Sequence, residues 1–183
     1  LSPILRLTES NHTSTKIKCA SILSRLSIMP RSHADFKLDD LYRLLQLYLV
    51  DDLPTWQRLA IALSNLSQNL RLRDMLLSLE GTLSVLLKMI SRPDEQLRRG
   101  CAAILCNLSS AEGVERRFVD AAVVPTLLVT ALLASGELTC KKSCLYTFMN
   151  LMNAEDRHPR MVKEGLLWGL STLAMEKDEE IVR

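Results

Sequence analysis

A short apolar motif that returns at a nearly fixed spacing constrains this chain more than any other feature. Its clearest copy, LRRGCAAILCNLS, covers residues 97–109, and the equivalent positions Arg25, Asn65, Asn107 and Asn150 are 40, 42 and 43 residues apart. Apolar residues within the copies recur at three- and four-residue steps, which is the periodicity of a helix. The sequence therefore predicts an all-α solenoid of stacked repeats with a period of about 42 residues.

The segments between the motif copies predict the other helices of each repeat. In the best-defined repeat, a first helix over 70–79 and a second over 82–90 meet at Gly81, and a turn at 91–95 leads to the motif helix. Glycine suits such a junction because it tolerates left-handed backbone angles. Gly165 takes the same place 84 residues later, which is two periods. The remaining helices are expected over 16–28, 38–50, 56–67, 114–121, 124–134, 139–153, 159–164 and 166–175, with turns at 51–55 and 135–138.

Aligning these helices divides the chain into about four repeats that form a single domain over residues 1–183. Complete repeats are expected at 31–69, 70–110 and 111–154, with partial repeats at 1–30 and 155–183. Both ends thus fall within a repeat, and the chain is expected to be a segment of a longer array. Uncapped ends of a solenoid expose apolar surface, so self-association through them is also expected.

Composition limits the classes of function. Only 4% of the 183 residues are aromatic, which favours stacked helices over a β-sandwich. The net charge of +2 gives no overall attraction to nucleic acid. The longest uncharged run, 121–136, contains Pro125 and is shorter than the roughly 18 to 20 apolar residues of a membrane span. Nucleic-acid binding and membrane insertion are therefore disfavoured.

The positions of the five cysteines are explained better by the repeat pattern than by a metal-binding or catalytic role. Cys19, Cys101 and Cys144 occupy one column that holds Leu59 in the remaining repeat, so this column is predicted to lie in the core. Cys140 and Cys144 are four residues apart and could share a metal, but no nearby histidine or second cysteine pair completes four ligands. We expect no metal and no cofactor. The odd number of cysteines indicates a reducing compartment, the cytoplasm or also the nucleus.

At this point the residues resemble a known family, the armadillo repeats, in the manner of beta-catenin and importin-alpha. The resemblance depends on the pattern A-x-x-L-S-N-L, which is AIALSNL at residues 60–66 and AAILCNL at 102–108. It also depends on the glycine between the first and second helices, preceded by glutamate at Glu80 and Glu164. HEAT repeats, the nearest alternative, have paired helices and lack the third-helix asparagine. The resemblance covers essentially the whole chain.

The resemblance implies a right-handed superhelix that is not an enzyme and has no catalytic residues. In this family the third helices line a concave groove that binds extended peptides, and asparagines hold the main chain of the partner. A carboxamide suits this role because it both donates and accepts hydrogen bonds. By resemblance, Asn65, Asn107 and Asn150 are these asparagines.

The sequence departs from the importin-alpha pattern in two respects. That subfamily has tryptophan four residues before each asparagine, whereas Ser21, Ile61, Ala103 and Tyr146 stand there in this chain. A role as a nuclear import receptor is therefore not expected. Arg25 replaces one asparagine. A guanidinium, which only donates hydrogen bonds and prefers carboxylates, thus stands where the other repeats have an amide that both donates and accepts.

Basic residues stand seven to nine positions before the asparagine column: Lys16, Lys18, Arg58, Arg98, Arg99, Lys141 and Lys142. The first turn of a helix normally favours acidic residues, because the helix dipole is positive there. One interpretation is a solvated face balanced by nearby acids such as Asp51, Asp52, Asp94, Glu95 and Glu137. The other is a basic ladder that selects an acidic peptide. The predicted groove residues are Arg25, Arg58, Asn65, Arg99, Asn107, Lys142, Tyr146 and Asn150.

Two functions remain open at the level of sequence. The first is a non-catalytic scaffold that binds an extended, acidic peptide of a partner protein along its third helices. The alternative is a structural spacer within a larger chaperone, motor-associated or cytoskeletal protein, in which other parts bind partners. Exposed third-helix cations without acidic partners would favour the first function.

Overall fold

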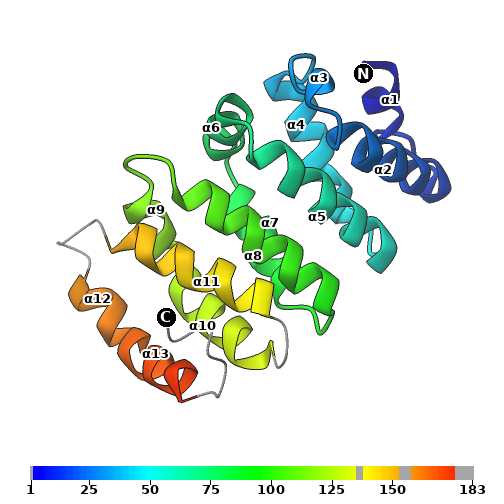
Figure 1. Ribbon diagram of the computed structural model, residues 1–183. Coiled ribbons are helices and arrows are strands. Elements are labelled where there is room, and N and C mark those ends of the chain that lie inside the picture. Colours follow the sequence, from blue (N-terminus) through cyan, green and yellow to red (C-terminus); the bar gives the residue numbers. More distant parts are fainter. Residues whose placement is uncertain (1, 135–137, 153–157, 176–183) are drawn as a thin grey trace. The chain divides into compact units, whose positions relative to one another are not determined.

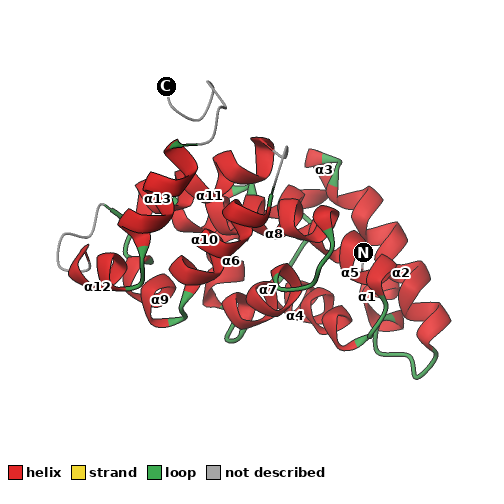
Figure 2. Cartoon of the chain, turned by 90° about the horizontal axis from the view of Figure 1, so that it is seen from below, coloured by secondary structure: helices red, strands yellow, loops and turns green. Residues whose placement is uncertain are grey.

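The computed structural model describes residues 2–134, 138–152 and 158–175, and the regular elements within these ranges are all helices, with no strand (Figure 1, Figure 2). The predicted all-α fold is confirmed. Contacts within the chain group it into two compact units, residues 1–85 and 86–183. In the described ranges, no helix has the length and apolar character needed to cross a membrane.

The first unit contains two motif helices, α2 and α5, which pack side by side (Figure 1). The other helices of this unit are shorter. In chain order the elements are α1 (Ser2–Leu7), α2 (Thr13–Ser27), α3 (Pro30–His33), α4 (Leu38–Leu45), the 3₁₀ helix η1 (Gln46–Leu49), α5 (Leu53–Ser67), α6 (Leu70–Ser78) and the first residues of α7 (Thr82–Ile90).

The second unit repeats this plan with α8 and α11, which are again in direct contact (Figure 1). After the end of α7, its elements are α8 (Glu95–Ser109), α9 (Glu115–Asp120), α10 (Val123–Leu133), α11 (Leu138–Leu151), α12 (His158–Lys163) and α13 (Leu166–Ala174). The predicted turn at 135–138 and the end of the helix predicted over 139–153 lie partly outside the described residues.

Capping side chains decide where several helices begin. The Asp52 carboxylate accepts a hydrogen bond from the backbone N–H of Thr55 at 2.8 Å, so α5 begins at Leu53 rather than at the predicted residue 56. Asp94 caps α8 in the same way by accepting from the N–H of Leu97 at 2.8 Å. Such a cap contributes about 1 kcal/mol because it pairs an N–H that the helix leaves without a partner.

The predicted helix over 38–50 is interrupted. Its α-helical part ends at Leu45, and the chain tightens into a 3₁₀ turn from Gln46 to Leu49 before the extended residue Val50. Such tightening is common at the end of a helix, where carbonyl groups have lost their α-helical partners. Hydrophobic periodicity does not separate the two helix types over so short a distance, so the prediction was wrong in this detail.

The junctions between first and second helices have left-handed backbones, as predicted for the glycines. Gly81 has φ of 86° and Gly165 has φ of 94°. The equivalent residue of the repeat between them is Ala122, with φ of 57°, and it is the only described residue other than glycine with positive φ. The repeat therefore imposes this conformation even where a side chain is present.

The apolar columns of the motif helices form the core, and the cysteine column belongs to it. Cys19, Cys101, Cys144 and Leu59 are all 2% exposed or less, which confirms the prediction for this column. Each fully buried leucine on these helices contributes on the order of 2 kcal/mol through removal of apolar surface from water. Thiols at these positions act as small apolar groups.

An arginine of one first helix holds the end of the preceding first helix in both units. In the first unit, Arg71 donates to the carbonyl groups of His33 at 2.7 Å and Phe36 at 3.1 Å. In the second unit, Arg160 donates to the carboxylate of Asp120 at 2.6 Å and the carbonyl of Val119 at 3.1 Å. These contacts bridge neighbouring repeats and satisfy carbonyl groups at helix ends.

Candidate functional site

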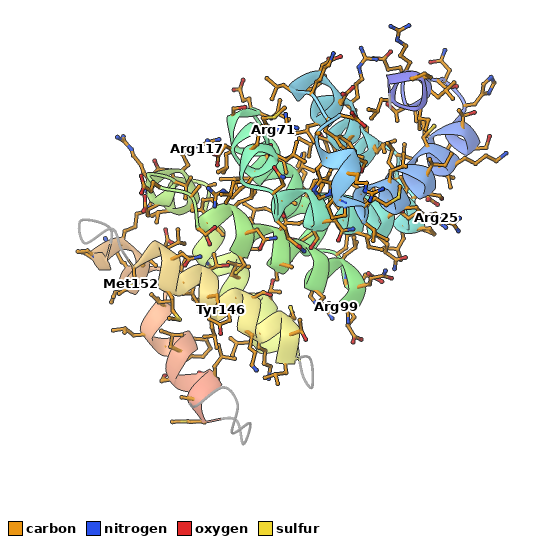
Figure 3. All side chains as sticks on the ribbon, turned by 45° about the horizontal axis from the view of Figure 1, so that its top comes forward. Arg25, Arg71, Arg99, Arg117, Tyr146 and Met152 are labelled. Carbon is orange, nitrogen blue, oxygen red and sulfur yellow. The ribbon has the colours of Figure 1, made fainter. Side chains whose placement is uncertain are left out.

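The first candidate surface consists of Lys16, Lys18 and Arg25 on α2 together with Arg58 and Asn65 on α5. Lys18 and Arg25 are exposed, whereas Lys16 and Arg58 are half-buried, and Arg25 is labelled on α2 in Figure 3. None of these four cations forms an ion pair with another described residue. The two helices therefore carry four basic residues without an acidic ion-pair partner in the described part of the chain.

Asn65 connects the two helices of this surface. Its Nδ2 donates to the hydroxyl of Ser27 at 3.0 Å, and that hydroxyl donates to the carbonyl of Ser24 at 2.7 Å. The predicted groove asparagine is thus tied to the preceding repeat. Its Oδ1 and second N–H make no hydrogen bond to the described residues, and both groups are needed to pair with a peptide main chain.

The second candidate surface, on α8 and α11, contains the same connection. Asn150 donates through Nδ2 to the hydroxyl of Ser109 at 2.9 Å, and Ser109 donates to the carbonyl of Cys106 at 2.8 Å. Asn107 lies half-buried at the equivalent position of α8. Two asparagines of the column, one in each unit, therefore make the same bond to a serine of the repeat before.

The remaining predicted residues give the second surface a mixed character. Arg99 is exposed near the beginning of α8 and has no ion-pair partner in the described ranges, whereas Lys142 is half-buried. Tyr146 is 55% exposed on α11, and the neighbouring Met149 is 63% exposed. Arg99 and Tyr146 are labelled on these helices in Figure 3. Lys141, which the sequence placed in the basic ladder, is only 4% exposed.

Two of the acids that the first interpretation expected to balance the ladder have another role. Asp52 and Asp94 are the N-caps of α5 and α8 and accept from backbone N–H groups. Glu137 lies outside the described residues. Asp52 and Asp94 thus accept from the backbone at the beginning of these helices, and neither Arg58 nor Arg99 forms an ion pair with a described residue.

Comparisons with known proteins identify the fold. No protein-family model matches the sequence, and no curated protein does. Among solved structures, computationally designed armadillo repeat proteins for modular peptide recognition match with a TM-score of 0.82 at 17% identity, over 99% of this chain and 77% of theirs. A designed armadillo repeat protein in complex with the peptide (KR)4 matches with a TM-score of 0.79 at 17% identity, over 99% and 77%. An engineered protein from a structural genomics programme matches with a TM-score of 0.80 at 22% identity, over 98% and 73%.

The chain has an armadillo-like repeat fold. In this fold α2, α5, α8 and α11 are third helices, as predicted from the A-x-x-L-S-N-L pattern. Sequence identities this low establish a shared fold but not a shared function. The role of each side chain must therefore be argued from its own position and contacts in this chain.

The cysteines of the armadillo-like core do not form an evident metal site. No group of three or more potential ligands is assembled among the described residues. A hydrogen bond to Cys140, together with burial, raises the pKa of the Cys144 thiol. Burial likewise raises the pKa of Cys101 and of Cys106, although a hydrogen bond with Thr147 opposes the effect at Cys106. These thiols therefore stay protonated at neutral pH and are poor metal ligands and nucleophiles.

Sequence reasoning missed the serine partners of the asparagines. A signal was available, because a serine stands two residues after the column position in three copies of the motif, at Ser27, Ser67 and Ser109. The regular spacing was visible, but its meaning requires knowing which helices are neighbours. It also missed the half-burial of Arg98, whose Nε has no hydrogen-bond partner.

Proposed function

We propose that this chain is a non-catalytic scaffold that binds an extended acidic peptide along its third helices. The observation that carries the proposal is the set of third-helix cations without an acidic partner in the described part of the chain: Lys16, Lys18, Arg25, Arg58 and Arg99. Like charges on the neighbouring helices α2 and α5 repel one another, so holding several cations there is unfavourable unless an external anion compensates for them. Arg25 differs from the other cations because it lies in the last turn of α2, where the helix dipole favours a positive charge.

The asparagines complete the recognition chemistry. Asn65 and Asn150 each use one N–H within the fold and keep a carbonyl oxygen and a second N–H for a ligand. A main-chain amide of an extended peptide matches this donor and acceptor pair, and each such bond adds about 1 kcal/mol. The amides would hold the main chain, and the cations would select acidic side chains.

Similar proteins support the peptide-binding part of the proposal, and the charge of this chain refines it. A designed armadillo repeat neighbour has a solved structure in complex with (KR)4, a basic peptide. The cations of α2 and α5 would repel such a peptide, since no described acid neutralises them. The preferred partner of this chain therefore has the opposite charge.

Binding of short extended peptides, measured by fluorescence anisotropy, tests the proposal. We expect a Glu-Ser repeat peptide to bind more tightly than its Gln-Ser counterpart, and a Lys-Ser peptide not to bind. The double variant Arg25→Ala/Arg58→Ala should weaken binding of the acidic peptide about tenfold, because two charge-assisted contacts are lost.

The matched control is Arg6→Ala/Arg31→Ala, which makes the same change in net charge at exposed residues outside the third helices. We expect it to bind like the native chain. If both double variants lost the same affinity for the acidic peptide, the effect would come from net charge and not from the third helices. If the folded native chain bound none of the peptides, the spacer function would be supported instead.

Two further expectations belong to this proposal. All five cysteines lie in the described part as thiols, four of them buried, which supports action in a reducing compartment such as the cytoplasm or nucleus. Self-association through the repeat ends stays a prediction.

A further inference from the structure

A cavity of about 420 Å³ opens beside the beginning of α8 in the second unit. Ile90 and Pro93 contribute one wall, at the end of α7 and in the turn that follows, and Val129 and Leu133 of α10 contribute another. Arg98 of α8 also lines it. The lining residues include none of the predicted groove residues, so the cavity is a separate feature of the armadillo-like fold.

The walls of the cavity are apolar and offer few hydrogen-bond donors. Val129 is 56% exposed and Leu133 is 62% exposed, although both are large apolar residues. The hydroxyl groups that line the cavity are used by their own helices, since Thr126 donates to the carbonyl of Ala122 at 3.1 Å and Thr130 to that of Thr126 at 2.8 Å. Ser91 likewise donates to the carbonyl of Leu87 at 2.7 Å.

Arg98 supplies the polar group of the cavity. Its side chain makes no hydrogen bond or ion pair with the described residues, and its Nε is buried without a partner. The second guanidinium in the lining belongs to Arg92, and no acidic residue is among the described residues of the lining. An unpaired, partly buried guanidinium beside an apolar wall favours a ligand that brings a carboxylate, which it can bind through two N–H groups.

We propose that this cavity binds a small monocarboxylate with an apolar body, of the medium-chain fatty-acid type. Its volume lies in the range of small-molecule sites, about 300 to 1,000 Å³. The apolar body would cover Val129 and Leu133 while the carboxylate pairs with Arg98. A peptide suits the cavity less well, because the lining hydroxyls are already committed as donors and cannot pair with main-chain carbonyls.

Calorimetric titration of the whole chain with decanoate, and with decanol as the uncharged counterpart, tests this site. We expect decanoate to bind at least about tenfold more tightly than decanol, because only the carboxylate gains the charge-assisted bonds. The variant Arg98→Met keeps the aliphatic stem and should remove this preference. The matched control Arg117→Met makes the same change at an exposed residue of α9 that neither lines the cavity nor belongs to the predicted groove, and it should bind decanoate like the native chain.

A second variant protects the test against misfolding of Arg98→Met. Leu133→Glu changes an exposed residue and should abolish decanoate binding by repelling the carboxylate and removing an apolar wall. Equal affinity for decanoate and decanol, unchanged binding in both cavity variants, or no binding to the native chain would each overturn the proposal. The result is independent of peptide binding, which is proposed to depend on Lys16, Lys18, Arg25, Arg58 and Arg99, none of which lines the cavity.

Discussion

Ala122 holds a left-handed backbone conformation, with φ of 57° and ψ of 37°, at a junction where the neighbouring repeats have glycine. The Cβ of an L-residue crowds the backbone in this region, at a cost of roughly 1 to 2 kcal/mol. The side chain is exposed and therefore contributes little packing in return. The residue is a point of strain that the fold imposes between α9 and α10.

Replacing Ala122 with glycine should stabilise the protein by about 0.5 to 1 kcal/mol, because relief of strain exceeds the added freedom of the unfolded chain. The free energy of unfolding, measured by urea denaturation, checks this. Ala121→Gly is the control: this neighbour has an ordinary φ of −80°, so its replacement should destabilise instead. Destabilisation by both variants would show that the strain at Ala122 is smaller than the cost of the added freedom of the unfolded chain.

Recurring positions of the repeat were easier to predict from the sequence than the environment of the side chains at those positions. The asparagine column, the buried cysteines and the junction glycines were all visible as repeated letters. Lys141 and Lys142 looked equivalent as letters, but consecutive residues lie about 100° apart around a helix. One of them is therefore buried, and no count of charges could show which.

At the scale of elements, neighbouring third helices are joined by polar contacts as well as by leucine packing. The bonds from Asn65 to Ser27 and from Asn150 to Ser109 link residues 38 and 41 positions apart. In both pairs the serine hydroxyl also donates to its own helix. The asparagine thus adds one bond between helices to a serine that is already satisfied as a donor.

A double-mutant cycle with Asn150→Ala and Ser109→Ala should give a coupling energy of about 0.5 to 1.5 kcal/mol, the usual value of one hydrogen bond between side chains. The cycle is read from unfolding free energies in urea. Asn65→Ala and Ser27→Ala provide the matched pair in the first unit and should couple to a similar extent. Strict additivity in both cycles would mean that the bonds do not stabilise the helix contacts.

Element boundaries were predicted less well than element identity, for a physical reason. Hydrophobic periodicity locates the middle of a helix, but caps decide its ends, as Asp52 does for α5. The same limit hid the 3₁₀ turn after α4, which has no signature of its own in the apolar pattern. The residues of the candidate surfaces lie within their helices and not at the capping positions. The sequence could therefore predict which helices carry these residues, but it could not predict which side chains they contact.

At the scale of the whole molecule, the chain divides into two compact units, residues 1–85 and 86–183, each held together by its own internal contacts. In a repeat protein, each repeat is stabilised by itself and by its neighbours alone. A core defect should therefore lower stability most strongly in its own unit. This expectation separates an array with partly independent units from one domain that unfolds in a single step.

Hydrogen exchange measured by mass spectrometry can distinguish these cases with two reciprocal variants. Leu63 of α5 is 1% exposed and Leu105 of α8 is fully buried, so truncating either to alanine should cost about 2 to 5 kcal/mol. We expect Leu63→Ala to accelerate exchange mainly in helices α2 to α6, and Leu105→Ala mainly in α8 to α13. Because the two substitutions remove the same atoms from third helices, a difference in pattern can come only from position. Uniform acceleration by both would show that the two units unfold together, and the chain would then behave as one cooperative domain.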